Sequence, residues 1–177
     1  MLQSLITSRT RLRILVKFFI SAANSGYLNG LAVEFGESTN AIRRELNNLS
    51  NAGYLVQSKN KNKIVYAANT KHTLFEVLQK IVRKHLGLEQ IVESVLLQIG
   101  DVNQIILIGD YALGRDTGTI KIILIAGQVD TLYIHQLQRK LKNIIERTVL
   151  FYINSPVPNT GIVLYDKTNT DAVATDL

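Results

Sequence analysis

The chain has 177 residues, of which 46% are hydrophobic, and this allows one large domain or two small ones with modest cores. It contains no cysteine, which excludes disulfide bonds and thiolate metal sites, and its three histidines lack the spacing of a zinc site. No apolar run is long enough to span a membrane, and the N-terminus lacks the pattern of a signal peptide. We therefore expect a cytoplasmic protein with no membrane partner, no bound metal and no cofactor.

The net charge of +6 is unevenly distributed along the chain. Residues 1–86 carry 13 Lys and Arg against 4 Asp and Glu, whereas residues 87–177 carry 7 against 10. The first half is thus strongly basic and the second mildly acidic. This asymmetry predicts that any contact with a polyanion is made by the first half.

Three helices are predicted in the first fifty residues. Residues 8–23 start at a serine cap and carry an apolar face, and residues 21–27 form a connection rich in turn formers. Residues 28–35 read as a short helix, and a glycine-containing turn leads from it into a helix over residues 38–52. Two helices joined by such a turn are typical of a helix-turn-helix unit, whose second helix is placed for the DNA groove.

The helix at 38–52 has one apolar and one polar face. Ser38 and Thr39 can cap its start, and Ile42, Leu46 and Leu49 form its apolar stripe. The opposite face gathers four polar residues, Asn40, Arg44, Asn47 and Asn51, with Arg43 beside them. Arg and Asn make paired hydrogen bonds to guanine and adenine edges in the major groove. An ordinary amphipathic helix with a solvated polar face is the alternative, but the neighbouring elements favour a recognition helix.

A basic hairpin is predicted directly after this helix. Two β-rich runs, at 54–58 and 63–67, flank a polar turn that includes Lys59, Lys61 and Lys63. Such lysines can simply make a turn soluble. After a helix-turn-helix, however, the hairpin over residues 54–67 reads better as a wing that lies along DNA phosphates.

The predicted helix at 72–86 carries an apolar face that is wide for so small a domain. Its members are Leu74, Phe75, Leu78, Ile81, Val82 and Leu86. We expect this face to pack against another domain or another subunit. The helix completes an N-terminal domain over residues 1–86.

Four short motifs of this half resemble the winged helix-turn-helix transcriptional regulators of bacteria. They are residues 7–11 (TSRTR), 35–43 (FGESTNAIR), 53–55 (GYL) and 69–72 (NTKH). Within these regulators, the chain is similar to the group whose winged helix is fused to a nucleotidyltransferase-like domain. The resemblance implies a sequence-specific DNA-binding transcriptional regulator, which usually binds double-stranded DNA as a homodimer.

The second half alternates helices with strands. Helices are predicted at 88–99 and 131–146, and strands at 104–108, 119–126, 148–153 and 161–165, followed by a polar tail to residue 177. This order predicts a small α/β or α+β domain over residues 87–177. The whole chain is therefore expected to be α+β, with a winged helix-turn-helix first and the α/β domain second.

The second half resembles the minimal nucleotidyltransferase fold. In that fold a strand ends in Gly-Ser-x-Ala-x-Gly, whose turn holds nucleotide phosphates, and the next strand supplies Asp-x-Asp for metal ions. This chain keeps Gly109 and Gly114 but has Asp110 in place of the serine, and Thr119 and Lys121 stand where the carboxylates are expected. Because divalent cations prefer anionic oxygen ligands, we expect a domain that is not an enzyme.

The resemblances imply a set of functional residues. Contacts with DNA are expected from Ser38, Thr39, Asn40, Arg43, Arg44, Asn47, Lys59, Lys61 and Lys63. The second domain is expected to serve dimerisation, docking of a protein partner, or sensing of a small molecule through Gly109, Asp110 and Gly114. The alternatives are a nucleotidyltransferase with a winged-helix docking module, and a protein-interaction module of the toxin–antitoxin type.

Overall fold

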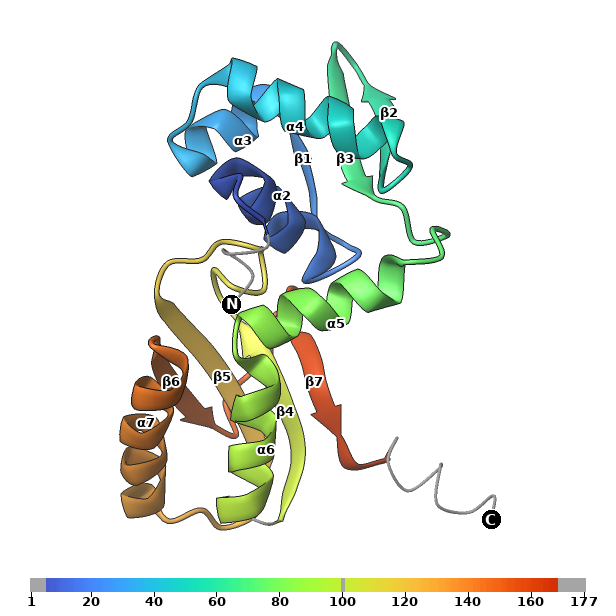
Figure 1. Cartoon of the computed structure of the whole chain (residues 1–177). Coiled ribbons are helices and arrows are strands. Elements are labelled where there is room, and N and C mark those ends of the chain that lie inside the picture. The colour runs from blue at the N-terminus through green and yellow to red at the C-terminus, as the bar shows by residue number, and fades with distance from the viewer. Residues whose placement is uncertain (1–5, 100, 169–177) are drawn as a thin grey trace. The chain divides into compact units, whose positions relative to one another are not determined.

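A computed structural model describes residues 6–99 and 101–168, so the end of the predicted polar tail lies outside the described residues. The described part contains six helices and two sheets, which confirms the mixed α+β class (Figure 1). It divides into two compact units. Unit 1 is Met1–His85 with Leu113–Arg115, and unit 2 is Leu86–Ala112 with Asp116–Leu177. None of the described helices is long and apolar enough to cross a membrane.

The core of unit 1 is built by helices α2, α3 and α4. They span Arg9–Phe19, Leu28–Phe35 and Thr39–Asn51, and each contacts the other two or the sheet beside it. Their apolar faces meet in a buried cluster. Its largest members are Ile14, Phe18, Phe19, Ile20, Leu31, Ile42 and Leu46. The helical spacing of these residues in the sequence is what brings them to one side of each helix.

Helix α2 is shorter than the predicted helix at 8–23. It begins after Ser8, whose hydroxyl accepts a hydrogen bond from the Arg11 amide at 3.1 Å, and it ends at Phe19. Ser21 then starts a turn, because its carbonyl accepts from the Asn24 amide at 3.1 Å and its hydroxyl from the Ala23 amide at 3.3 Å. A serine that bonds to nearby backbone competes with helix continuation, which explains the early end.

A three-stranded antiparallel sheet completes the first part of unit 1. Strands β2 (Leu55–Asn60) and β3 (Lys63–Ala68) form the predicted hairpin, and β1 (Ser25–Tyr27) pairs with β3 to give the order β1-β3-β2. Strand β1 falls in the segment that the sequence predicts to be only a connection. Three residues are too few to show the period of a strand, so β1 depends on its partner β3.

The predicted apolar face at 72–86 is only partly buried. Helix α5 (Phe75–His85) packs on α2, with the rings of Phe19 and Phe75 5.8 Å apart. Leu74, Val77 and Ile81 remain 43%, 48% and 39% exposed. The part of the face that contains Phe75 and Val82 is therefore buried. The stripe formed by Leu74, Val77 and Ile81 stays exposed to solvent.

Unit 2 is a four-stranded mixed sheet. Its strands are β4 (Val102–Ile108), β5 (Thr119–Ala126), β6 (Thr148–Ile153) and β7 (Ile162–Asp166), in the order β6-β5-β4-β7. Strand β4 runs antiparallel to both β5 and β7, and β5 runs parallel to β6. The β4–β5 turn is therefore a hairpin-like connection, whereas the parallel pair needs a crossover helix.

Helices α6 (Leu88–Ile99) and α7 (Thr131–Ile145) contact each other and the sheet, side by side (Figure 1). Helix α7 is the crossover between β5 and β6. Its buried residues recur every three or four positions, at Ile134, Leu137, Leu141 and Ile145. This spacing gives α7 one apolar face toward the sheet, and its solvent side mixes polar residues with the exposed Leu132, Tyr133 and Ile144.

Candidate functional site

The polar face predicted for the recognition helix lies open to solvent. In α4, Asn40, Arg43, Arg44 and Asn47 are all exposed, as is Thr39 at its first position. The predicted stripe of Ile42, Leu46 and Leu49 is buried on the other side. Two members of the polar face contact each other, since Arg43 Nη1 donates to Asn40 Oδ1 at 3.1 Å. The structure therefore brings these residues together on one accessible face.

Ser38 has a structural role at the start of α4. It is the N-cap residue, and its hydroxyl oxygen accepts a hydrogen bond from the Ala41 amide at 3.2 Å. Ser38 itself is exposed. Its oxygen is thus held at the helix N-terminus, where unpaired amides favour an anion such as phosphate.

Glu45 is a residue of α4 that the sequence does not single out, and it fixes the helix in place. It is only 2% exposed. Its carboxylate accepts from the Ser8 hydroxyl at 2.9 Å and from Arg11 Nε at 2.8 Å. These contacts tie α4 to the start of α2 and so set the direction in which the polar face points. The sequence feature that indicates burial of Glu45 is its position inside the stripe of Ile42, Leu46 and Leu49.

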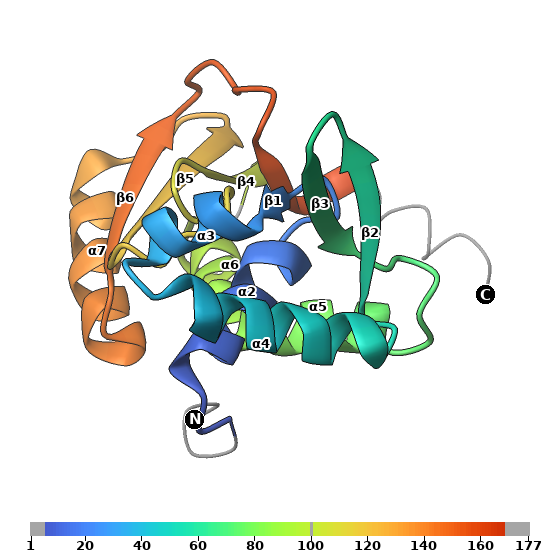
Figure 2. The same cartoon turned by 90° about the horizontal axis from the view of Figure 1, so that it is seen from above.

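The three lysines of the hairpin have different surroundings. Lys59 and Lys61 are exposed, and Lys61 takes a left-handed backbone conformation with φ of 51° in the turn. Lys63 is also exposed, but its Nζ lies 4.4 Å from the centre of the Tyr27 ring, a cation–π distance. Strand β2 contacts α4, and Figure 2 shows the hairpin rising beside the C-terminal end of that helix.

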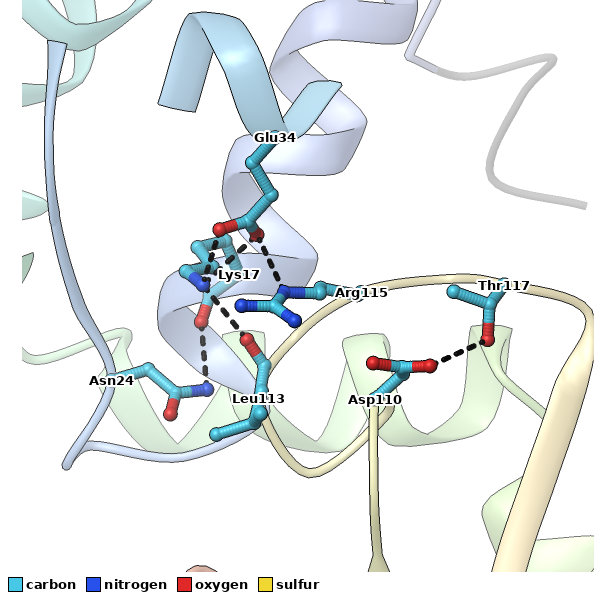
Figure 3. Close-up of polar contacts among 7 residues, drawn as sticks. All are labelled: Lys17, Asn24, Glu34, Asp110, Leu113, Arg115 and Thr117. Carbon is cyan, nitrogen blue, oxygen red and sulfur yellow. Dashed lines mark hydrogen bonds and ion pairs between the residues drawn. The ribbon is translucent and has the colours of Figure 1, made fainter. Parts of the chain in front are cut away.

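The predicted ligand turn follows β4, and the structure divides its residues. Gly109 and Asp110 belong to unit 2, whereas Gly114 belongs to unit 1. Asp110 accepts from the Thr117 hydroxyl at 3.5 Å (Figure 3). The Lys121 side chain packs on Gly109. Among residues 6–99 and 101–168, no three His, Asp or Glu side chains gather as a group able to hold a metal ion.

Lys17 organises the part of unit 1 around Leu113–Arg115. This buried lysine donates from Nζ to Glu34 Oε1 at 2.9 Å and to the Leu113 carbonyl at 3.0 Å (Figure 3). Arg115 Nε lies 3.6 Å from the same Glu34 oxygen. The sequence indicates Lys17 only as a charge that interrupts an apolar stretch. Its partners are 17 and 96 positions away in the chain, so no local pattern points to them.

A buried tyrosine holds the end of the β4–β5 turn. The Tyr111 hydroxyl donates to the Asp116 carboxylate and accepts from Arg147 Nε at 3.0 Å and from the Gly118 amide at 3.1 Å. Arg147 Nη2 also lies 2.7 Å from Asp116 Oδ2. Burial, aided by the hydrogen bond to Asp116, raises the pKa of Tyr111. Burial alone would raise the pKa of Asp116, but the hydrogen bonds from Arg147 and Tyr111 outweigh it and lower that pKa.

This cluster predicts a loss of stability in acid. Because the folded protein lowers the pKa of Asp116, its contribution is present at neutral pH and is lost as the pH falls below the ordinary Asp value of about 3.9. Asp116→Asn should lower the urea midpoint at pH 7 and narrow the gap between the midpoints at pH 7 and pH 3. Asp101→Asn, at a more exposed aspartate, is the control. An unchanged gap in Asp116→Asn would contradict the assignment.

No protein-family model matches the chain, and no curated protein matches it. Solved structures similar to it include a mutant of the toxin–antitoxin MntA–HpeT, at 19% identity and a TM-score of 0.41, covering 48% of this chain and 77% of that one. The tri-AMPylated HEPN toxin of Shewanella oneidensis in complex with MNT antitoxin is similar at 17% identity and a TM-score of 0.38, covering 51% of this chain and 78% of that one. A toxin–antitoxin with AMP-PNP is similar at 19% identity and a TM-score of 0.40, covering 48% of this chain and 77% of that one. Each of these similarities covers about half of this chain.

The comparisons contradict the prediction that the chain is not an enzyme. That prediction depended on Thr119 and Lys121 standing in place of two carboxylates. The similar structures include one with AMP-PNP and one with a tri-AMPylated toxin. The prediction that the second domain is not an enzyme is therefore wrong. At identities below 20%, the substrate and the partner of those proteins are not transferred to this chain.

Proposed function

We propose that unit 1 is a winged helix-turn-helix that binds double-stranded DNA in a sequence-specific manner and regulates transcription. The observation that carries this proposal is the exposed Asn and Arg face of α4 opposite its buried stripe. Arg43, Arg44 and Asn47 are the side chains proposed to read base edges. Ser38, Thr39 and Asn40, at the helix N-terminus, are proposed to contact phosphate.

The β2–β3 hairpin is the proposed wing. Lys59 and Lys61 extend from it into solvent and would pair with backbone phosphates, which adds affinity on any sequence. Lys63 is proposed to contribute less, because its ammonium already lies over the Tyr27 ring. The wing thus supplies electrostatic attraction while α4 supplies selectivity.

The exposed stripe of α5 is the proposed homodimer contact. Leu74, Val77 and Ile81 lie on one side of the helix, with Glu76 near its start and Lys84 near its end. Two copies crossing antiparallel would place the acidic start of each helix beside the basic end of the other, whereas a parallel pair would oppose like charges. Two copies would then present two α4 helices to successive half-sites.

The test is a single substitution on the polar face of α4. Arg44→Ala should weaken specific binding by about 1–3 kcal/mol if Arg44 makes a paired base contact. A duplex selected from a random pool, its scrambled version and fluorescence anisotropy give the measurement, and the stoichiometry reports whether two chains bind each duplex. Lys140→Ala, an exposed cation on α7, is the matched control and should change affinity little. Equal affinity of the unmodified protein for the selected and scrambled duplexes would contradict the proposal.

A second candidate is nucleotidyl transfer to a protein partner, in a module of the toxin–antitoxin type. One contact favours it: the Lys121 side chain lies against Gly109, with Cδ 3.3 Å from where a Cβ on that glycine would stand. A lysine beside a glycine turn can pair with nucleotide phosphates as a point charge. Calorimetric titration with AMP-PNP and magnesium should then show binding that Lys121→Met abolishes and Lys140→Met retains. Absence of heat with the unmodified chain would reject this candidate.

A further inference from the structure

Strand β6 forms one edge of the sheet in unit 2. Within the described residues it pairs only with β5. The Thr148 amide donates to the Gly118 carbonyl at 3.0 Å, and the Asn154 amide donates to the Leu124 carbonyl at 2.9 Å. Since the bonding side alternates along a parallel pair, the N–H and C=O groups of Val149, Phe151 and Ile153 point to the outer side. Val149 is only 1% exposed, so the groups of Phe151 and Ile153 are the template for another strand.

The composition of β6 does nothing to protect this edge. Its sequence, TVLFYI, contains no charged residue and no proline. Natural edge strands are usually blunted by lysine, proline, a bulge or a covering segment. The β5–β6 register from Thr119↔Thr148 to Leu124↔Ile153 is continuous, without a bulge. The apolar second half of this edge, at Phe151 and Ile153, is therefore open to pairing.

A groove of about 410 Å³ runs between this edge and the polar face of α7. Its floor is the start of β6, from Thr148 to Leu150. Its wall is made by α7 residues at helical spacing, and three of them, His135, Arg139 and Lys142, are basic. All three are exposed. The groove thus places positive charge beside the start of the edge strand.

We propose that this groove binds an extended, acidic segment of a partner protein, which adds to β6 as a fifth strand. Backbone hydrogen bonds to Phe151 and Ile153 would hold the segment, and carboxylates on alternate residues would face Arg139 and Lys142. A second copy of this chain is a poor occupant, because its β6 offers no acid and its α7 would bring like charges together. The inference does not depend on DNA binding by unit 1.

The experiment uses the full chain and a fluorescein-labelled eight-residue peptide of alternating glutamate and valine. Fluorescence anisotropy should show saturable binding. The same peptide with methyl groups on its alternate, strand-facing amides keeps its charge but cannot pair with an edge, and should lose about tenfold or more in affinity. A lysine–valine peptide should not bind. Equal binding of the methylated and unmethylated peptides would overturn the proposal.

A matched pair of substitutions locates the site. Lys142→Glu places a carboxylate in the groove and should weaken the glutamate–valine peptide by about tenfold. Lys140→Glu makes the same change two residues away, outside the groove lining, and should alter affinity by less than about twofold. Circular dichroism checks that both variants fold. Equal weakening by both variants, displacement of the peptide by duplex DNA, or self-association that Lys142→Glu abolishes would each overturn the proposal.

Discussion

Replacing Gly114 by alanine is expected to lower the free energy of unfolding by about 3 kcal/mol. Gly114 has φ of 75°, a conformation that costs a residue with a Cβ about 1 kcal/mol. A Cβ placed there would also lie 2.5 Å from Lys17 Cα and 2.7 Å from the Lys17 carbonyl oxygen. Both are backbone atoms of a buried helix, so neither can rotate away, and the clash has to move main chain.

Gly118→Ala is the matched control for this prediction. Gly118 has a similar φ of 81°, but no described atom lies within 4 Å of the Cβ that alanine would add. Gly118→Ala should therefore lower the free energy of unfolding only by the cost of the positive φ, about 1 kcal/mol. Urea denaturation followed by circular dichroism compares the two variants with the unmodified chain. Equal losses in both variants would show that Lys17 does not confine Gly114 in solution.

Replacing Lys17 by methionine is expected to cost about 3 kcal/mol, because removing one partner of a buried ion pair leaves the other without compensation. The change keeps an unbranched side chain of similar length, so packing changes little. It leaves the Glu34 carboxylate with only Arg115, at 3.6 Å, and the Leu113 carbonyl without its donor. Chemical denaturation again gives the measurement.

Lys167→Met provides the comparison for Lys17. Lys167 Nζ lies 3.0 Å from Asp101 Oδ1, almost the same separation as in the Lys17–Glu34 pair, but both side chains are about half exposed or more. Water screens such a pair, so its loss should cost less than about 1 kcal/mol. If Lys17→Met were no more harmful than Lys167→Met, burial of the Lys17–Glu34 pair would contribute nothing to stability. The pair would then not organise unit 1.

Local pattern was enough to predict most elements of this chain. Helices at 28–35 and 88–99 and strands at 119–126 and 148–153 were predicted with the bounds that the structure shows. Each of these has an apolar residue recurring at the period of its own element, and each ends at turn-forming residues. The division of α4 into a buried stripe and a polar face has the same origin, because helix geometry alone assigns the faces.

Other features needed the tertiary structure. Strand β1 exists because β3 supplies its partner, and Glu45 is buried because Ser8 and Arg11 lie beside it in space. Glutamate in a helix ordinarily faces water, and the position of Glu45 inside the apolar stripe does not reveal which residues would be its partners. The early end of α2 likewise followed from the hydrogen bonds of Ser21, which a periodic apolar pattern does not reveal.

The amino-acid sequence by itself determined the faces of the helices, the alternating order of the second half and the basic character of the first, because these depend on neighbours a few residues apart. Only the tertiary structure decided that Gly114 belongs to unit 1 and Gly109 to unit 2, and that β6 is an open edge beside a basic groove. Those features join positions that are far apart in the chain. They are stabilised by contacts that form only after distant segments of the chain have come together. The local periodicity of apolar residues does not indicate such contacts.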